Sequence, residues 1–320
     1  MATPQLVRDL IQMLLITARI SRVATQHYGG PSRGQGSEHT EHRLDRGDPA
    51  PHLRLETILL PLSIQDPDQS QAKALRPATP DGPDLDGLEK LCATRPVRAI
   101  HTMPTLHNPL GRVMPATDRT RLVKIARQHG ALIIEDTSYA CLVEDPPPPL
   151  AATAPDITVY VSGLSKSVAT GLRVGFAAAP PSAVPSLERA IRATTWNTPA
   201  LTTAIACRWL DDGTVDRLEA QKRDDAKARQ AIAGQELAGL PFVGHPLSYF
   251  TWLPLPDDAR ADRLTAALAR RHISVATAEP FTTSMHTPQA IRLALGSTDL
   301  DSLRSTLRTV RRVAVEDAYA

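Results

Sequence analysis

The sequence is poor in cysteine and aromatic residues, and it carries almost no net charge. Its 320 residues include 3 cysteines, and only 4% are Phe, Trp or Tyr. Cys92, Cys141 and Cys207 are odd in number and contain no C-x-x-C pair, which argues against a disulfide framework and a thiolate metal site. A formal net charge of +2 offers no basic field for nucleic acid or a membrane. We expect a soluble protein of a reducing cytoplasm that by this chain alone binds no nucleic acid.

Long apolar runs are also missing. The apolar segment at residues 13–18 is short and has charged residues on both sides, so it predicts neither a membrane-spanning helix nor a signal peptide. Residues 29–52 are rich in Gly, Pro, Ser, His and charge without a period, which is typical of a loop or a disordered stretch. The histidines of this region keep no regular ligand spacing: His27, His39, His42 and His52. We therefore predict no metal site.

From residue 53 onward, strand-like runs alternate with helical periods, which predicts a mostly parallel sheet with helices packed against it. The predicted strands lie at 55–60, 97–102, 131–134 and 158–161, and the predicted helices at 85–92 and 116–129. The runs at 131–134 and 158–161 are continuously apolar, as central strands covered on both faces are. The sequence thus predicts an α/β fold for a large domain at residues 1–205.

A second, smaller α+β unit is predicted at residues 206–320. A long charged helix at about 215–237 leads into it. Its further predicted elements are a strand at 249–253, a helix at 258–271, a strand at 272–276 and a closing helix at 300–315.

Three chemically distinct side chains follow the ends of neighbouring predicted strands. Asp136 ends one apolar run, Lys166 follows the next, and Arg173 comes seven residues later. A lysine amine, an acid and a guanidinium are what a pyridoxal 5'-phosphate site needs to bind the aldehyde, the pyridine nitrogen and the phosphate. Each residue alone would be assigned to the surface, to a helix cap or to an ion pair, but together at these spacings they predict the cofactor site.

An Asn-Pro turn precedes this trio. Asn108 lies in the stretch 107–111, where Asn-Pro with a nearby Gly sets a turn that can present the amide to a cleft. Alone the turn is weak evidence. Asn108 is, however, twenty-eight residues before Asp136, which is thirty residues before Lys166.

These spaced motifs resemble those of a known family. Residues 102–180 are similar to the aminotransferase class I/II group of fold-type-I pyridoxal phosphate enzymes, and especially to the aminotransferase-like domain of MocR/GntR-type regulators. Looser similarity continues at 196–210, around Trp252 and at 290–297. The resemblance implies the PLP-transferase type I fold and a homodimer with its site near the subunit boundary.

The resemblance also implies roles around the cofactor ring. Asn108 and Tyr139 would share the ring oxygen, and Asp136 would keep the pyridine nitrogen protonated. Lys166 would form the internal aldimine and then, once displaced by the substrate's amino group, act as the base at the substrate Cα.

Further positions match the family's phosphate and substrate contacts. Arg173 would hold the phosphate, helped by a hydroxyl from Ser165 or Ser162, because Gly163 stands where the family often has Ser or Thr. Arg292 would grip the α-carboxylate of an amino acid, although a structural ion pair is its alternative.

The first residues depart from the family pattern. The helical period at 5–15 resembles the helix that follows the family's glycine-containing phosphate loop, which leaves residues 3–5 in the place of that loop. Pro4 has no N–H to donate to a phosphate. Tyr28 lies where the family's ring-stacking aromatic falls, with a loop tyrosine as the alternative.

Three functions follow from this resemblance. The first is an aminotransferase that exchanges an amino group between an amino acid and a 2-oxo acid through a lysine aldimine. The second is a MocR-like effector module that senses pyridoxal phosphate or amines without turnover. The third is an inactive remnant that no longer holds the cofactor.

Overall fold

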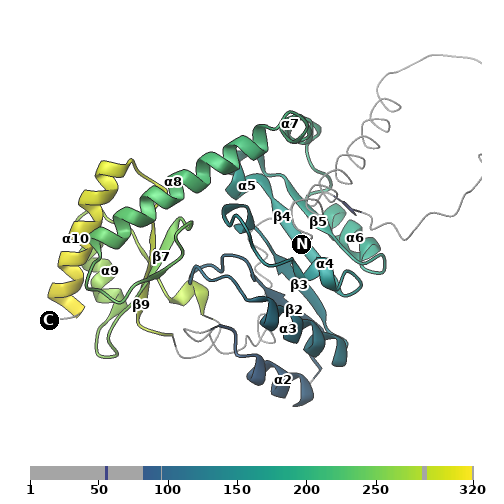
Figure 1. Cartoon of the computed structure of the whole chain (residues 1–320), viewed down its shortest axis with the longest axis horizontal. Helices are drawn as coiled ribbons and strands as arrows, with labels where there is room; N and C mark the ends of the chain where they lie inside the picture. Colours follow the sequence, from purple (N-terminus) through teal and green to yellow (C-terminus); the bar gives the residue numbers. More distant parts are fainter. Residues whose placement is uncertain (1–54, 57–81, 95, 283–286, 319–320) are drawn as a thin grey trace, which may run out of the picture.

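A computed structural model describes residues 55–56, 82–94, 96–282 and 287–318 of the chain. Two β-sheets with their own helices lie side by side, and one long helix runs across both (Figure 1). The predictions for residues 5–15 and 29–52 and for the four histidines lie outside the described residues. Within the described part, no helix has both the length and the apolarity that a membrane crossing requires.

The first sheet is the mostly parallel sheet of an α/β fold, as predicted. Its strands are β1 (Leu55–Glu56), β2 (Ala99–Thr102), β3 (Leu132–Asp136), β4 (Thr158–Gly163) and β5 (Gly175–Ala178). They are ordered β1-β5-β4-β3-β2. Strands β2, β3 and β4 pair in parallel, whereas β5 is antiparallel to both β4 and β1. All strands except β5 therefore run in one direction.

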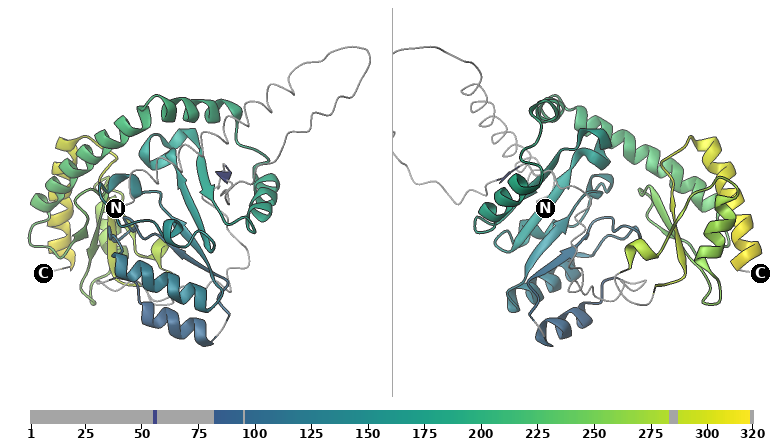
Figure 2. Two further views of the ribbon diagram at one scale, coloured as in Figure 1. Left: turned by 45° about the vertical axis from the view of Figure 1, so that its right-hand side comes forward. Right: turned by 180° about the vertical axis from the view of Figure 1, so that it is seen from behind.

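Helices cover both faces of this sheet (Figure 2). On one face, α2 (Leu85–Thr94) and α3 (Ala116–Gln128) pack on Ile133 through side chains such as Leu88 and Ile125. On the other face, Val184 of α6 (Val184–Thr194) packs against Val159. Successive strand residues point to opposite faces, so the continuous apolar runs supply both cores. The remaining helices of this part are α4 (Leu150–Thr153), α5 (Leu164–Ser167) and α7 (Ala200–Asp211).

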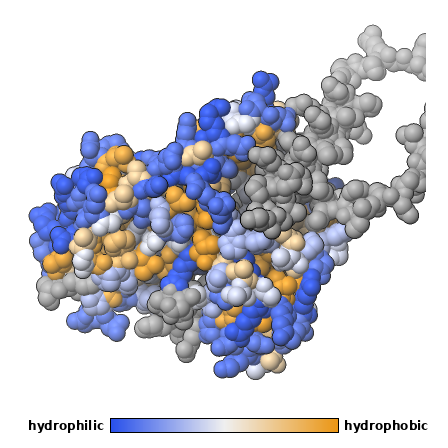
Figure 3. Space-filling view, viewed as in Figure 1, coloured by the Kyte–Doolittle hydropathy of each residue, from blue (hydrophilic) through white to orange (hydrophobic). Residues whose placement is uncertain are grey.

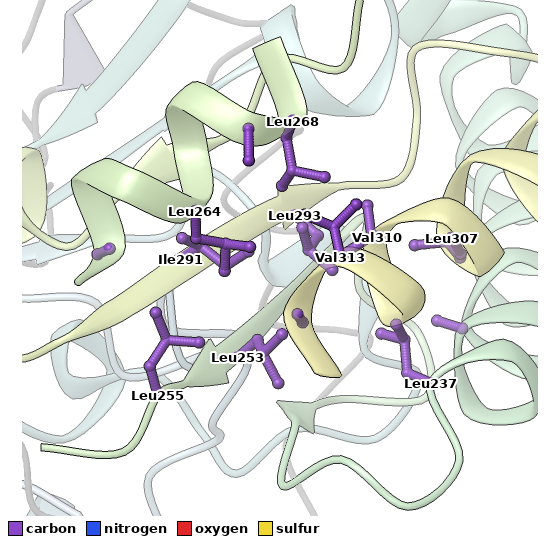
Figure 4. Close-up of a cluster of buried hydrophobic side chains, with 14 of the residues drawn as sticks. Leu237, Leu253, Leu255, Leu264, Leu268, Ile291, Leu293, Leu307, Val310 and Val313 are labelled. Carbon is purple, nitrogen blue, oxygen red and sulfur yellow. The ribbon is translucent and has the colours of Figure 1, made fainter. Parts of the chain in front are cut away.

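The second sheet is antiparallel and smaller. It orders β6 (Val243–Gly244), β7 (Phe250–Pro254), β9 (Ala290–Ala294) and β8 (Ala276–Thr277). Helices α9 (Ala261–Ala269) and α10 (Leu300–Ala318) pack on one face and bury a leucine-rich core (Figure 4). Leu253 and Ile291 of the sheet meet Leu264 and Val310 of the helices there. Each such fully buried side chain contributes about 1.5–3 kcal/mol.

Helix α8 (Thr214–Glu236) belongs to both cores. Near its start, Val215 packs with Leu164 beside the first sheet. Near its end, Ile232 lies in the core of the second sheet. Arg229 donates two hydrogen bonds of 2.7 Å to carbonyls just beyond β9, and Gln230 donates two of 2.9 Å to carbonyls at the start of β7. These bonds fix the second half of α8 to the second sheet.

The strand predicted at 272–276 is wrong for most of its length. His272 adopts a left-handed conformation with φ 61°, and the Ile273 N–H donates to the Leu268 carbonyl at 3.1 Å. This turn ends α9 in the manner of a helix C-cap, so β8 begins only at Ala276. The predicted division between residues 205 and 206 falls inside α7, and it stays a prediction.

Candidate active site

The topology brings the predicted trio to one edge of the first sheet. Asp136 is the last residue of β3 and pairs in register with Val161 of β4. Lys166 lies three residues beyond the end of β4. Because β5 is antiparallel to β4, its first residue, Gly175, pairs with Gly163, which places Arg173 near the same edge. Polar groups at the carboxyl ends of parallel strands are where ligands bind in such sheets.

Lys166 is carried by the one-turn helix α5, whose position is set by a close backbone crossing. The Leu164 N–H donates to the Val174 carbonyl at 3.1 Å. A Cβ on Gly163 would lie only 3.0 Å from the same carbonyl oxygen, so a larger residue here would press against the backbone of residue 174. The Lys166 Nζ lies 5.6 Å from the centroid of the Tyr139 ring, within cation–π range, and forms no ion pair with a described carboxylate.

The Asp136 carboxyl group is held by the turn that follows it. Its Oδ1 accepts hydrogen bonds from the Ser138 N–H at 2.9 Å and from the Ser138 hydroxyl at 2.6 Å. Its Oδ2 receives no hydrogen bond from the residues that the structure describes. The acid is therefore oriented through one oxygen, and the other is left for a donor such as a protonated ring nitrogen.

The side-chain oxygen of Asn108 is buried without a partner among the described residues. Its Oδ1 receives no hydrogen bond from the described part of the chain, although its backbone N–H donates to the Met103 sulfur at 3.2 Å. A buried amide left unpaired costs free energy unless a ligand satisfies it. Gly111 closes this turn at φ 64°, and a Cβ there would lie 2.9 Å from the backbone nitrogen of His245. The turn is thus pressed against the part of the chain that carries the second sheet.

A buried ion pair that was not predicted anchors both ends of the Asn108 loop. Arg119 of α3 is 4% exposed and Glu135 of β3 is 0% exposed, and their closest atoms, Nη1 and Oε1, are 3.9 Å apart. Arg119 also donates to the carbonyls of Pro104 and Met114 at 3.0 Å and to the Thr105 hydroxyl at 2.8 Å. Burial raises the pKa of Glu135, against the opposing effects of two backbone N–H groups and of Arg119. The sequence does contain a signal that could have revealed this pair: Glu135 lies in an otherwise apolar predicted strand.

Arg292 lies between two aromatic rings. Its Cζ is 4.9 Å from the Phe250 ring centroid and 5.7 Å from that of Phe281. Its buried Nε has no hydrogen-bond partner, and it forms no ion pair with a residue in the described ranges. Burial lowers the pKa of Arg292, while the nearby Tyr139 raises it. No carboxylate among the described residues pairs with Arg292, so the alternative of a structural ion pair has no partner there.

The two serines lie in different environments. By strand alternation and the register of Glu135 with Tyr160, Ser162 is on the face of Tyr160 and opposite to that of Asp136. Ser165 lies half-buried in the same turn as Lys166. This arrangement favours the Ser165 hydroxyl over that of Ser162 as a ligand on the Asp136 side of the sheet.

The remaining predicted ligands are Arg173, Tyr28 and the segment 3–5. Arg173 is exposed, has a left-handed backbone with φ 52°, and forms no ion pair with a described residue. Its guanidinium is thus not engaged by a protein carboxylate at this edge of the sheet. Tyr28 and residues 3–5 lie outside the described residues.

A glutamate behind the Lys166 turn also escaped prediction. Glu219 of α8 faces the buried Ser167 hydroxyl without meeting ordinary hydrogen-bond geometry. Burial raises the pKa of Glu219 to about 7, opposed by Arg223 and reinforced by Asp216. Arg223 in turn donates to the Cys141 carbonyl at 2.8 Å. Burial raises the pKa of the Cys141 thiol to about 12, so this cysteine is an inert packing residue.

The residues that meet at this edge fit pyridoxal phosphate. Lys166 is free of carboxylates in the described chain, Asp136 has an oxygen that accepts no hydrogen bond from it, and the Asn108 Oδ1 is buried and unpaired there. Amide nitrogen and oxygen have nearly the same shape, so either end can face a ring oxygen. An α/β fold with this donor set defines the class of fold-type-I pyridoxal phosphate proteins.

The chain belongs to the aminotransferase class I and II family, whose model matches residues 74–308. It is 26% identical over 262 residues to the uncharacterized HTH-type transcriptional regulator YdeF of Bacillus subtilis. The matched region covers 81% of this chain and 55% of that protein. The chain is 27% identical over 246 residues to 2-aminoadipate transaminase of Thermus thermophilus, which covers 74% of this chain and 62% of that protein. The chain thus spans less than two thirds of the length of either relative.

Solved structures share the fold. LysN, an α-aminoadipate aminotransferase of Thermus thermophilus solved in complex with N-(5'-phosphopyridoxyl)-L-leucine, matches with a TM-score of 0.69 and 26% identity. The match covers 74% of this chain and 64% of that one. A kynurenine aminotransferase of Pyrococcus horikoshii, at 21% identity and a TM-score of 0.70, supports the fold alone.

Proposed function

We propose that the protein is a pyridoxal phosphate-dependent aminotransferase that acts on an amino acid and a 2-oxo acid. One observation carries this proposal: Lys166, Asp136, Arg173 and Arg292 form no ion pairs with the described residues, and the buried Arg292 Nε and Asn108 Oδ1 have no hydrogen-bond partner among them. Arg229, a mostly buried arginine of α8, is paired by contrast, with its Nε 2.8 Å from the Asp225 carboxylate. Buried polar atoms left without partners on Arg292 and Asn108 indicate a site that a polar, charged ligand completes.

Each side chain then has a distinct role. Bound pyridoxal phosphate supplies an electron sink that eases removal of the substrate Cα proton. Lys166 would hold the cofactor aldehyde and, once the substrate amino group has displaced it, would take up that proton on Nζ. The free Asp136 oxygen would accept a hydrogen bond from the protonated ring nitrogen, and Arg173 with Ser165 would hold the phosphate. Arg292 binds the α-carboxylate in a forked contact, with its apolar ring neighbours keeping water away.

The visible spectrum of the purified chain with added pyridoxal phosphate tests this function. We expect an absorption band that is lost in Lys166→Ala, that changes on addition of amino acids and that accompanies turnover with 2-oxo acids. The amino acids should include 2-aminoadipate, the substrate in the name of the Thermus relative. Absence of a band, or a band unchanged in Lys166→Ala, would refute the proposal in favour of an inactive remnant.

A second candidate is a MocR-like effector module that binds the cofactor or an amine without turnover. It is supported by the similarity to YdeF, whose name describes an HTH-type transcriptional regulator. A Lys166-dependent band that changes with amino acids, without any transfer to 2-oxo acids, would favour this candidate over the enzyme.

We also propose that the chain forms a homodimer. Trp196 and Leu201, between α6 and the first turns of α7, are 79% and 72% exposed. Large apolar side chains this exposed are costly in water unless another surface covers them. In the space-filling view, hydrophilic residues dominate the outer rim, and apolar residues also show between the two sheets (Figure 3).

A further inference from the structure

Four side chains from the two halves of the molecule touch in series. Arg292 of β9 lies with its Cζ 4.9 Å from the ring centroid of Phe250 on β7. The Phe250 and Tyr139 rings are 5.3 Å apart at 75°, in an edge-to-face contact. Lys166 Nζ lies 5.6 Å from the centroid of that same Tyr139 ring. The series thus joins a side chain of the second sheet to the lysine at the edge of the first.

Phe250 is closely packed within this series. It is 0% exposed and shares a buried cluster with Leu106 and Leu142. Its backbone is also held in place: the Phe250 N–H donates to the Ser248 hydroxyl at 3.0 Å, and the Phe250 carbonyl accepts from the Gln230 side chain at 2.9 Å. A ring held this tightly passes a displacement on one side to the contact on its other side, because close-packed interiors have almost no free volume.

The second ring against Arg292 provides an internal comparison. Phe281 lies 5.7 Å from the same Cζ, but its own ring contact is with Trp252, at 6.2 Å and 86°. Phe281 therefore touches the guanidinium without touching Tyr139 through a ring contact. Two phenylalanines thus share the contact with Arg292, and only Phe250 continues it toward Lys166.

We propose that Phe250 is a positioning residue that couples carboxylate binding at Arg292 to the protonation of the Lys166 nitrogen. The inference rests on the proposed function. A carboxylate that binds Arg292 neutralises its charge and draws the guanidinium away from the ring face, which weakens the cation–π contact with Phe250. The Phe250 ring then shifts against Tyr139, and the face that Tyr139 presents to Lys166 changes with it. Occupation of the substrate clamp is thereby sensed at the lysine.

The test is a pH titration of the visible band of the full chain loaded with pyridoxal phosphate, with and without saturating 3-phenylpropanoate. This probe has a carboxylate and no amino group, so it cannot replace Lys166. The band reports the protonation of the Lys166 nitrogen. In the wild-type protein we expect the carboxylate to change the proton affinity of this nitrogen about three- to tenfold, the range of a single contact of this type. Binding of the probe is measured separately by calorimetry.

The variants separate coupling from stability. Phe250→Leu should reduce the carboxylate-induced change to less than about a third, since a leucine has no ring face for either neighbour. Phe281→Leu should weaken probe binding but keep the full change at saturation. Leu253→Ala, a truncation of a buried side chain on the same strand, controls for lost stability and should also keep the full carboxylate-induced change. Phe250→Tyr retains the ring and should restore the coupling, and Phe250→Met takes the place of Phe250→Leu if the latter fails to fold.

The outcomes distinguish this inference from the function on which it rests. If the wild-type chain shows no Lys166-dependent band, both fall. If the band is present but Phe250→Leu keeps the full carboxylate-induced change, or if the wild type shows none, only the coupling through Phe250 is overturned.

Discussion

Glu219 should make the protein less stable as the pH rises from 5 to 8. Its carboxyl group has a pKa raised from 4.5 to about 7, mainly by burial against the turn that carries Lys166. A carboxyl group with a raised pKa binds a proton more tightly in the folded than in the unfolded state. Its contribution to stability is therefore complete below pH 4.5 and is lost as the pH rises through 7.

The size of the effect follows from the same values. A change from 4.5 to about 7 corresponds to at most about 3 kcal/mol of unfolding free energy. Glu219 keeps some solvent exposure, so we expect about 1–2 kcal/mol after screening. Glu219→Gln should match the wild type at pH 5 and exceed its stability by that amount at pH 8, because the amide carries no charge to bury.

Urea denaturation followed by far-ultraviolet circular dichroism at pH 5, 6, 7 and 8 measures this difference. Asp216→Asn is the matched control: Asp216 raises the pKa of Glu219, so its neutralisation should shift the loss of stability to lower pH. If the wild type and Glu219→Gln lost stability in parallel between pH 5 and 8, Glu219 would not be the titrating group.

Three further predictions test the site and the assembly. Arg119→Leu should lower the unfolding free energy by about 3–5 kcal/mol, because it leaves Glu135 charged and buried; Arg121→Leu on the exposed side of α3 should cost under about 1 kcal/mol in the same urea experiment. Asp136→Asn should leave cofactor binding detectable by absorbance but lower kcat at least about tenfold, since a neutral partner weakens the electron sink; an unchanged kcat would exclude Asp136 from the ring nitrogen. Trp196→Ser should weaken the proposed homodimer in light scattering, and a wild-type monomer would refute that assembly.

The central strands and the trio's location could be predicted because local sequence determines them. The runs at 131–134 and 158–161, shortly before Asp136 and Lys166, are continuously apolar, a pattern that a strand covered on both faces favours. The antiparallel β5 could not be predicted, because its direction depends on the backbone crossing at Gly163 rather than on a sequence pattern. The register of β5 with β4 places the neighbouring Arg173 near the edge where β4 ends, and its role as a phosphate ligand stays a prediction.

The supports of the site depend on tertiary contacts that no local pattern records. Arg119 and Glu135 are sixteen residues apart and on different elements, so their pairing appears only when α3 packs on β3. The same holds for Phe250, which the sequence marks as a strand residue and nothing more. Ser162 and Ser165 looked interchangeable in sequence, but strand alternation places Ser162 on the face opposite to Asp136, whereas Ser165 lies in α5 beyond the strand.

The two roles of α8 have a consequence for dissecting the molecule. Because Val215 completes the apolar cluster under the lysine turn and Ile232 completes that of the antiparallel sheet, a break at either end of the helix deprives one fragment of a core side chain. Separately expressed halves should therefore recover native structure only when mixed, which makes this helix the natural place to build a split reporter of chain association.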